Sequence, residues 1–195
     1  NGAGQDYAYR NLRASLNTDE ALARTLRNTN TSVLPAVFMW ADDETRHISS
    51  RDALRPLEAL LPNAIKSVHT ADSSEPLLNT HDPKGLTVNI PSLQAAAHAS
   101  GHINISPDAD GTLRRVALAV RYQGRFFPSA DLQAARILLG MPELAINTAA
   151  YGITGIELGK QLLPTDAEGN ILISYYGPAR TVPTYSAIDV LEERT

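Results

Sequence analysis

The sequence predicts an α/β fold with a mixed central β-sheet, helices on both faces of the sheet and two β-hairpins. A nearly wholly apolar stretch at residues 31–40 has the composition of a strand that is buried on both faces. Segments with apolar residues at helical spacing alternate with strands of this kind along the chain. Gln123-Gly124 and Gly159-Lys160 each separate two short strand-like runs, which is typical of a hairpin turn.

The first half of the chain carries helix and strand signals after a flexible start. Residues 1–16 are expected to form a flexible N-terminal segment, and residues 17–195 a single domain. Asn17 begins a helix, because Glu20 follows it at the spacing of a capping-box variant. Pro35 favours an edge position or a bulge for its strand. The other expected elements of this half are a polar loop at 42–51, a helix at 51–61, a strand at 64–70 and a connector at 72–84.

A dense run of local signals lies between residues 101 and 128. Pro107-Asp108-Ala109-Asp110-Gly111 has the composition of a turn. Apolar and polar side chains alternate along residues 115–122, which predicts a half-buried strand. This strand is expected to return through Gln123-Gly124 into residues 125–127.

Helices are predicted on both sides of this run. Gly101 is expected to end an alanine-rich helix whose first turn contains Pro91, and residues 102–105 to form a short strand. A helix is predicted from Ser129 to Leu139, ended by Gly140 in the C′ position. The rest of the chain is expected to contain an unassigned stretch at 141–154, a hairpin of residues 156–158 and 161–163, a strand at 171–178 and a short helix at 185–193.

Arg114 departs from the alternation, because its position places it on the same face as Val116 and Leu118. An unpaired guanidinium on an apolar face is strongly unfavourable, so Asp108 and Asp110 are the predicted partners. A structural ion pair is the favoured interpretation, and a contact with a ligand is the alternative.

Composition and motifs exclude several classes of function. The net charge is −4 and no Lys/Arg cluster exceeds two residues, so nucleic acid is not an expected partner. The chain has no cysteine, and neither Asp108-Ala109-Asp110-Gly111 nor the pair His98 and His102 has the full pattern of a calcium or zinc site. We therefore expect no metal and no cofactor. No Gly-x-Ser-x-Gly or Ser-x-x-Lys motif is present, which argues against the common nucleophile sites.

The order of motifs resembles a known family. Residues 101–115, the hairpin after them and the run from Phe127 to Gly140 are similar to the CHASE-type-two domain, the cyclase- and histidine-kinase-associated extracellular sensing module of bacterial membrane receptors. Residues 163–178 and 185–191 are similar to the C-terminal half of that family. The family members have further strand, helix and membrane segments at both ends, so the chain is expected to be a piece of such a domain. Ser174 stands where the family tends to have Asn.

The resemblance implies an extracytoplasmic (periplasmic or extracellular) sensor domain of a transmembrane protein such as a nucleotide cyclase or a histidine kinase. Such a domain binds an unknown small ligand or partner, is not catalytic itself, is membrane-anchored in the full-length protein and can form a homodimer. The candidate residues for ligand binding or a structural role are Asn104, Asp108, Asp110, Arg114, Tyr175 and Tyr176.

The sequence leaves one alternative function open, and the expected absence of flanking segments has one structural consequence. A stand-alone hydrolase, with a site assembled from dispersed residues, is the alternative function. The absence of the flanking segments is expected to leave an unpaired sheet edge or an exposed apolar groove, which would promote self-association.

Overall fold

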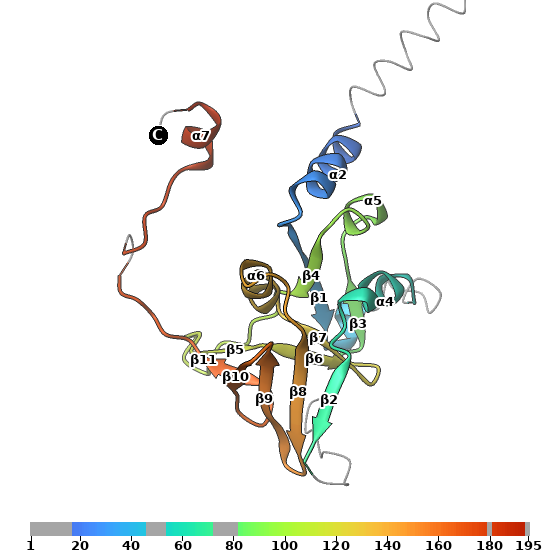
Figure 1. The fold of residues 1–195 in the computed structure, drawn as a ribbon, viewed down its shortest axis with the longest axis vertical. Coiled ribbons are helices and arrows are strands. Elements are labelled where there is room, and N and C mark those ends of the chain that lie inside the picture. The colour runs from blue at the N-terminus through green and yellow to red at the C-terminus, as the bar shows by residue number, and fades with distance from the viewer. Residues whose placement is uncertain (1–16, 46–53, 72–81, 179–180, 194–195) are drawn as a thin grey trace, which may run out of the picture.

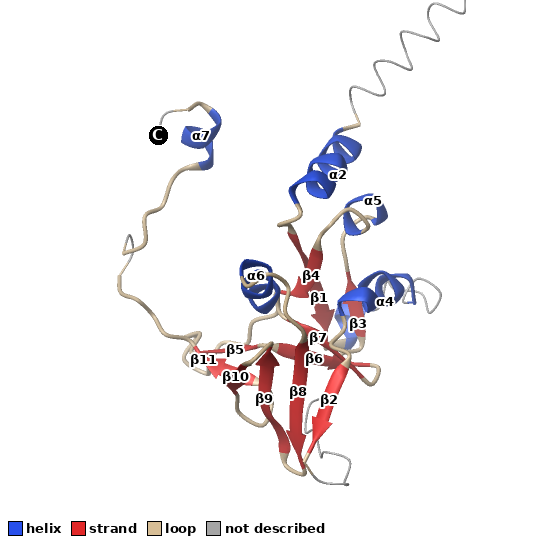
Figure 2. Cartoon of the chain, in the orientation of Figure 1, coloured by secondary structure: helices blue, strands red, loops and turns tan. Residues whose placement is uncertain are grey.

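A computed structural model describes residues 17–45, 54–71, 82–178 and 181–193 of the chain (Figure 1). The predicted α/β class is confirmed, because helices are combined with strands that pair both parallel and antiparallel (Figure 2). The described strands form four small sheets rather than one central sheet. The flexible segment expected at 1–16 and most of the connector expected at 72–84 lie outside the described residues.

A three-stranded sheet has the order β3-β1-β4, in which β1 (Val33–Met39) pairs antiparallel with β3 (Gly85–Thr87) and parallel with β4 (Ala99–His102). The edge position predicted from Pro35 is therefore wrong for β1 as a whole. Pro35 lies beyond the part of β1 that pairs with β3, and its carbonyl accepts a hydrogen bond from Asn89 Nδ2 at 2.9 Å. Proline has no backbone N–H, and at this position no neighbouring strand needs one for its pairing.

The alanine-rich helix predicted to end at Gly101 is much shorter than expected. Helix α5 spans only Pro91–Gln94, and Gly101 lies inside β4. A Cβ atom on Gly101 would lie 2.5 Å from the carbonyl carbon of Ser129, so glycine is required here for close approach and not for helix termination. Pairing with β1, a contact distant in sequence, overrides the helical propensity of the alanines.

A four-stranded sheet has the order β10-β9-β8-β2. Strand β2 (Ser67–Thr70) runs parallel to β8 (Leu144–Ala149), and β8 turns into β9 (Gly152–Leu158) within the stretch that the sequence left unassigned. The predicted hairpin at Gly159-Lys160 is confirmed, because β9 and β10 (Gln161–Pro164) pair antiparallel around Gly159, whose φ is 61°.

The strand predicted at 115–122 is divided at Leu118. Strand β5 (Arg115–Ala117) pairs with β11 (Asn170–Leu172), whereas β6 (Ala119–Tyr122) pairs with β7 (Arg125–Pro128). The tight turn between β6 and β7 is confirmed, with φ of 48° at Gln123 and 73° at Gly124.

Two of the helices begin at the capping residues that the sequence predicts. Asn17 Oδ1 accepts the N–H of Glu20 at the start of α2 (Thr18–Thr29), and Ser129 Oγ accepts the N–H of Leu132 at the start of α6 (Ala130–Leu138). The polar run predicted as a loop contains a short helix, α3 (Asp42–Thr45), so that prediction is wrong in its described part. The remaining helices are α4 (Leu54–Leu60), the 3-10 turn η1 (Leu61–Asn63) and α7 (Ala187–Leu191).

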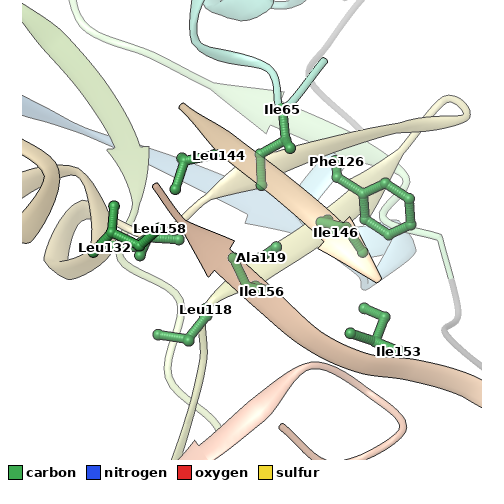
Figure 3. Close-up of a cluster of buried hydrophobic side chains, with 10 residues drawn as sticks. All are labelled: Ile65, Leu118, Ala119, Phe126, Leu132, Leu144, Ile146, Ile153, Ile156 and Leu158. Atoms are coloured by element: carbon green, nitrogen blue, oxygen red, sulfur yellow. The ribbon is translucent and has the colours of Figure 1, made fainter. Parts of the chain in front are cut away.

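Two clusters of buried apolar side chains meet at the β6–β7 hairpin. One cluster contains Ala119 and Phe126 together with residues of β8 and β9 (Figure 3), and the other contains Val120 and Phe127 together with residues of β1 and α4. Because successive residues of a strand point to opposite faces, the hairpin is covered on both faces. The prediction of a half-buried strand is therefore wrong for β6.

The outer parts of the molecule leave apolar side chains in contact with solvent. Val37 on β1 and Ile103, which directly follows β4, are exposed. Residues 173–178 and 181–193 carry further exposed apolar side chains, and Figure 1 shows α7 standing apart from the other elements. Among the described helices, none has the length and apolar composition that crossing a bilayer requires.

Candidate functional site

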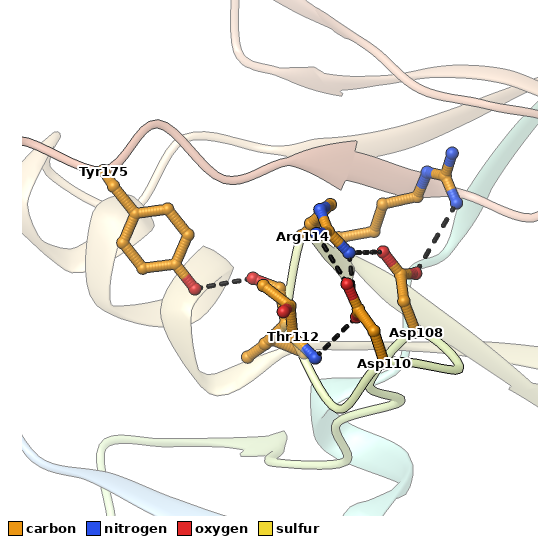
Figure 4. Close-up of polar contacts among 7 residues, drawn as sticks. Asp108, Asp110, Thr112, Arg114 and Tyr175 are labelled. Carbon is orange, nitrogen blue, oxygen red and sulfur yellow. Dashed lines mark hydrogen bonds and ion pairs between the residues drawn. The ribbon is translucent and has the colours of Figure 1, made fainter.

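Residues 108–114, here called the acidic turn, are organised around the guanidinium of Arg114 (Figure 4). Arg114 Nη1 donates to Asp108 Oδ2 at 2.9 Å and to Asp110 Oδ1 at 3.0 Å, and Nη2 donates to Asp110 Oδ2 at 2.8 Å. The predicted pairing therefore forms with both aspartates. The planar guanidinium donates two parallel hydrogen bonds to the Asp110 carboxylate, and this bidentate contact fixes the position of Arg114 relative to the turn.

The ion pairs of the acidic turn are open to solvent. The Arg114 side chain is 50% exposed and that of Asp110 is 56% exposed. The apolar-face position inferred for Arg114 is wrong, because the regular strand begins only at Arg115. Hydrogen bonds from Arg114, and to a lesser degree from the Thr112 backbone, lower the pKa of Asp110 to about 2. The hydrogen bonds to Asp110 and Asp108 raise the pKa of Arg114.

Asn104 has a structural role in the sheet. Its Oδ1 accepts the N–H of Phe38 at 2.9 Å, and its Nδ2 donates to the carbonyl of Phe38 at 2.8 Å. The side-chain amide thus replaces the peptide group of a neighbouring strand and prolongs the pairing of β1 beyond the end of β4. These two bonds use one N–H and one oxygen lone pair of the amide.

The two candidate tyrosines lie in different environments. The Tyr175 hydroxyl donates to the carbonyl of Leu113, and the N–H of Ile173 donates to the carbonyl of Arg114 at 2.9 Å. The acidic turn is thereby tied to the start of the C-terminal segment. Tyr176 is 87% exposed and is not brought to the turn.

A cavity of about 480 Å³ opens beside the acidic turn, and we call it the strand-end cleft. It lies past the carboxyl ends of β1 and β4, two parallel neighbours, which is the edge of a sheet where ligands commonly bind. A smaller cavity of about 180 Å³ shares three of its wall residues. The strand-end cleft is lined by Trp40, Asn104, Ile105, Ser106, Pro107, Asp108, Arg115, Ala117, Val120 and Asn170.

The aromatic and charged groups of the strand-end cleft are one indole, one guanidinium and one carboxylate. Arg115 Nη1 lies 3.9 Å from Asp108 Oδ1, which is longer than a hydrogen bond. The guanidinium therefore remains able to bind an acceptor group, while Trp40 and Ile105 offer apolar surface. Sequence reasoning missed Trp40, Arg115 and Asn170 as wall residues, because the pairing of β5 with β11 that brings two of them together connects distant parts of the chain.

The described residues offer no metal centre. No group of three or more His, Cys, Asp or Glu side chains in the described part of the chain is placed to hold an ion. His102, one of the two histidines with zinc-like spacing, is 1% exposed and lies in edge contact with the ring of Phe38. Neither ring nitrogen has a hydrogen-bond partner among the described residues, and burial lowers its pKa from the usual 6.5 to about 4.

The fold is that of a small α/β domain with a cleft at the carboxyl ends of two parallel strands. Comparison with protein families gives a match to the CHASE2 domain over residues 3–195. The chain belongs to this family, which comprises extracellular sensor domains of signalling proteins. Comparison with curated proteins and with solved structures gives no match.

Proposed function

We propose that this chain is the ligand-input domain of a transmembrane signalling protein such as a nucleotide cyclase or a histidine kinase. In this proposal it lies outside the cytoplasm, binds a small ligand in the strand-end cleft and catalyses no reaction itself. The observation that carries the proposal is the acidic turn, because it contacts both the cleft and the C-terminal segment. Asp108 lines the cleft, while the carbonyls of Leu113 and Arg114 hold Tyr175 and Ile173.

A ligand at Arg115 would act on the C-terminal segment through this turn. Arg115 and Asp108 are close enough to attract each other, and Asp108 also accepts from Arg114. An anionic group that binds Arg115 would draw it away from Asp108 and change the charge balance of the turn. Ile173 and Tyr175 are bonded to the turn, so a change in the turn would shift these two residues. Ligand binding would in this way move the start of the C-terminal segment.

The cleft favours a small molecule with an anionic group and an apolar body. The anionic group would bind the Arg115 guanidinium, and the apolar body would lie against Trp40 and Ile105. The volume of about 480 Å³ suits a molecule of the size of a small metabolite.

The test is a thermal-shift screen of the purified chain with small carboxylates, amino acids and short peptides, followed by titration calorimetry of each compound that raises the melting temperature. Arg115→Ala should weaken the binding of a true cleft ligand by about tenfold or more. Arg125→Ala, which changes an exposed arginine next to the β6–β7 turn, is the matched control and should bind as the wild type does. Equal affinity of the two variants would contradict the assignment of the cleft.

No observation on the described residues favours the hydrolase alternative. A panel of ester, amide and phosphate substrates tests it directly on the same purified chain. Turnover that one substitution abolishes would replace the sensor proposal with an enzyme.

A further inference from the structure

A second cleft, larger than the strand-end cleft, lies between α4 and α5, and we call it the helix cleft. Its volume is about 960 Å³, and it shares no wall residue with the strand-end cleft. Its walls come from α4, from the segment around α5 and from the C-terminal end of α6, which Figure 1 shows on the same half of the molecule.

The charged side chains of the helix cleft are incompletely paired. Arg55 on α4 has no hydrogen bond or ion pair with any described residue. Among the described residues, Arg136 on α6 bonds only through Nε, which donates to the carbonyl of Pro142 at 2.6 Å, so its two terminal nitrogens remain available there. Glu58 also lines the cleft without an ion pair to a described residue, so two guanidiniums face one carboxylate.

The wall of the helix cleft also contains an unsatisfied polar group and apolar surface. Gln94 is 7% exposed, its Nε2 donates to Ser100 Oγ at 2.8 Å, and its Oε1 has no partner among the described residues. This oxygen is itself buried, so it lies behind the wall and offers no contact to a ligand in the cleft. Prolines, alanines and Met141 supply most of the remaining surface.

We propose that the helix cleft binds an amphipathic organic anion. Its carboxylate or phosphate group is held by Arg55 and Arg136, because the planar fork of a guanidinium matches either group with two hydrogen bonds. Its apolar body lies against Pro56, Ala59 and Met141. The proposal is independent of the strand-end cleft, since it uses none of that cleft's residues.

The experiment compares four probes with the same alkyl chain, namely hexanoate, hexyl phosphate, hexanol and hexylammonium, titrated into the purified chain by calorimetry. The two anions should bind, and the neutral and cationic probes should not. The tighter of the two anions identifies the preferred head group. Equal binding of hexanol and hexanoate, or no binding of either anion, would overturn the proposal.

Variants of opposite charge change locate the site. Arg55→Gln should weaken anion binding by about tenfold. Glu58→Gln should tighten it by roughly two- to threefold, because a repulsive carboxylate is removed. Arg125→Gln, which changes an exposed arginine that does not line the helix cleft, is the control and should leave the affinity unchanged. An Arg55→Gln variant that melts as the wild type does and binds hexanoate with unchanged affinity would show that the anion binds elsewhere.

Discussion

The acidic turn and the β6–β7 hairpin are close in sequence but are held by different forces. The hairpin places Phe126 in one buried cluster and Phe127 in the other, so it joins the two cores of the fold. The acidic turn is held by exposed ion pairs of Arg114 and by short backbone bonds such as that from Gly111 N–H to the Asp108 carbonyl. Burial resists small perturbations, whereas exposed charge pairs respond to salt and to ligands. We therefore expect a rigid centre at the hairpin and a turn at the strand-end cleft that is more sensitive to salt.

The largest expected loss of stability comes from the hairpin. Phe127 is 1% exposed, so Phe127→Ala should lower the free energy of unfolding by about 3–5 kcal/mol through lost burial and the cavity left behind. Tyr176→Ala, at an exposed position, should change it by less than about 0.5 kcal/mol. Urea denaturation measures both values. A small loss for Phe127→Ala would show that the hairpin does not join the two cores.

His102 should make the free energy of unfolding depend on pH. Its pKa is lowered from 6.5 to about 4, so its contribution is complete above pH 6.5 and is lost as the pH falls from 6.5 to 4. The wild type should lose roughly 3 kcal/mol over this range from this group. His102→Leu should remove that dependence. Because two buried ring nitrogens without a partner among the described residues disappear, the variant should be at least as stable as the wild type at neutral pH.

The control for this prediction is His98→Gln, which changes an exposed histidine and should keep the pH dependence of the wild type. Denaturant unfolding followed across the pH range distinguishes the variants. An unchanged pH profile in His102→Leu would show that His102 is not the group responsible.

Gly101→Ala tests the contact between the three-stranded sheet and the start of α6. The new Cβ would lie 2.5 Å from the Ser129 backbone, so the variant should be less stable by about 1–3 kcal/mol. Thermal unfolding of the variant beside the wild type gives the difference. Unchanged stability would mean that α6 moves away without loss.

The smallest effects on stability are expected in the acidic turn. Because Arg114 and Arg115 are both at least half exposed, Arg114→Ala should reduce stability only slightly, and Arg115→Ala should reduce it less. The difference should shrink in high salt, which screens exposed charges. Unfolding at low and high salt provides the comparison. A large loss that salt does not change would place the turn in the core.

Sequence reasoning succeeded where the chemistry is local. Asn17 and Ser129 cap their helices, Gln123 and Gly124 form the predicted turn, and Arg114 pairs with aspartates four and six residues away. Each of these features depends on neighbours within six residues of sequence.

The rest of the fold depends on contacts between distant residues. Gly101 was assigned to a helix end because its partner, the backbone of Ser129, is not adjacent in sequence. The strand-end cleft was missed for the same reason, since Trp40, Arg115 and Asn170 are brought together only by the pairing of β1 with β4 and of β5 with β11. Local patterns identified the acidic turn but not the cavity beside it.

Amide hydrogen exchange in Arg114→Ala tests most directly whether the acidic turn controls the C-terminal segment. Loss of the guanidinium should loosen the turn, so the Ile173 N–H, which donates to the Arg114 carbonyl at 2.9 Å, should exchange faster than in the wild type. The amides of the β6–β7 hairpin should keep their wild-type rates, because burial holds them. An unchanged rate at Ile173, or an equal acceleration in the turn and the hairpin, would contradict the proposed coupling.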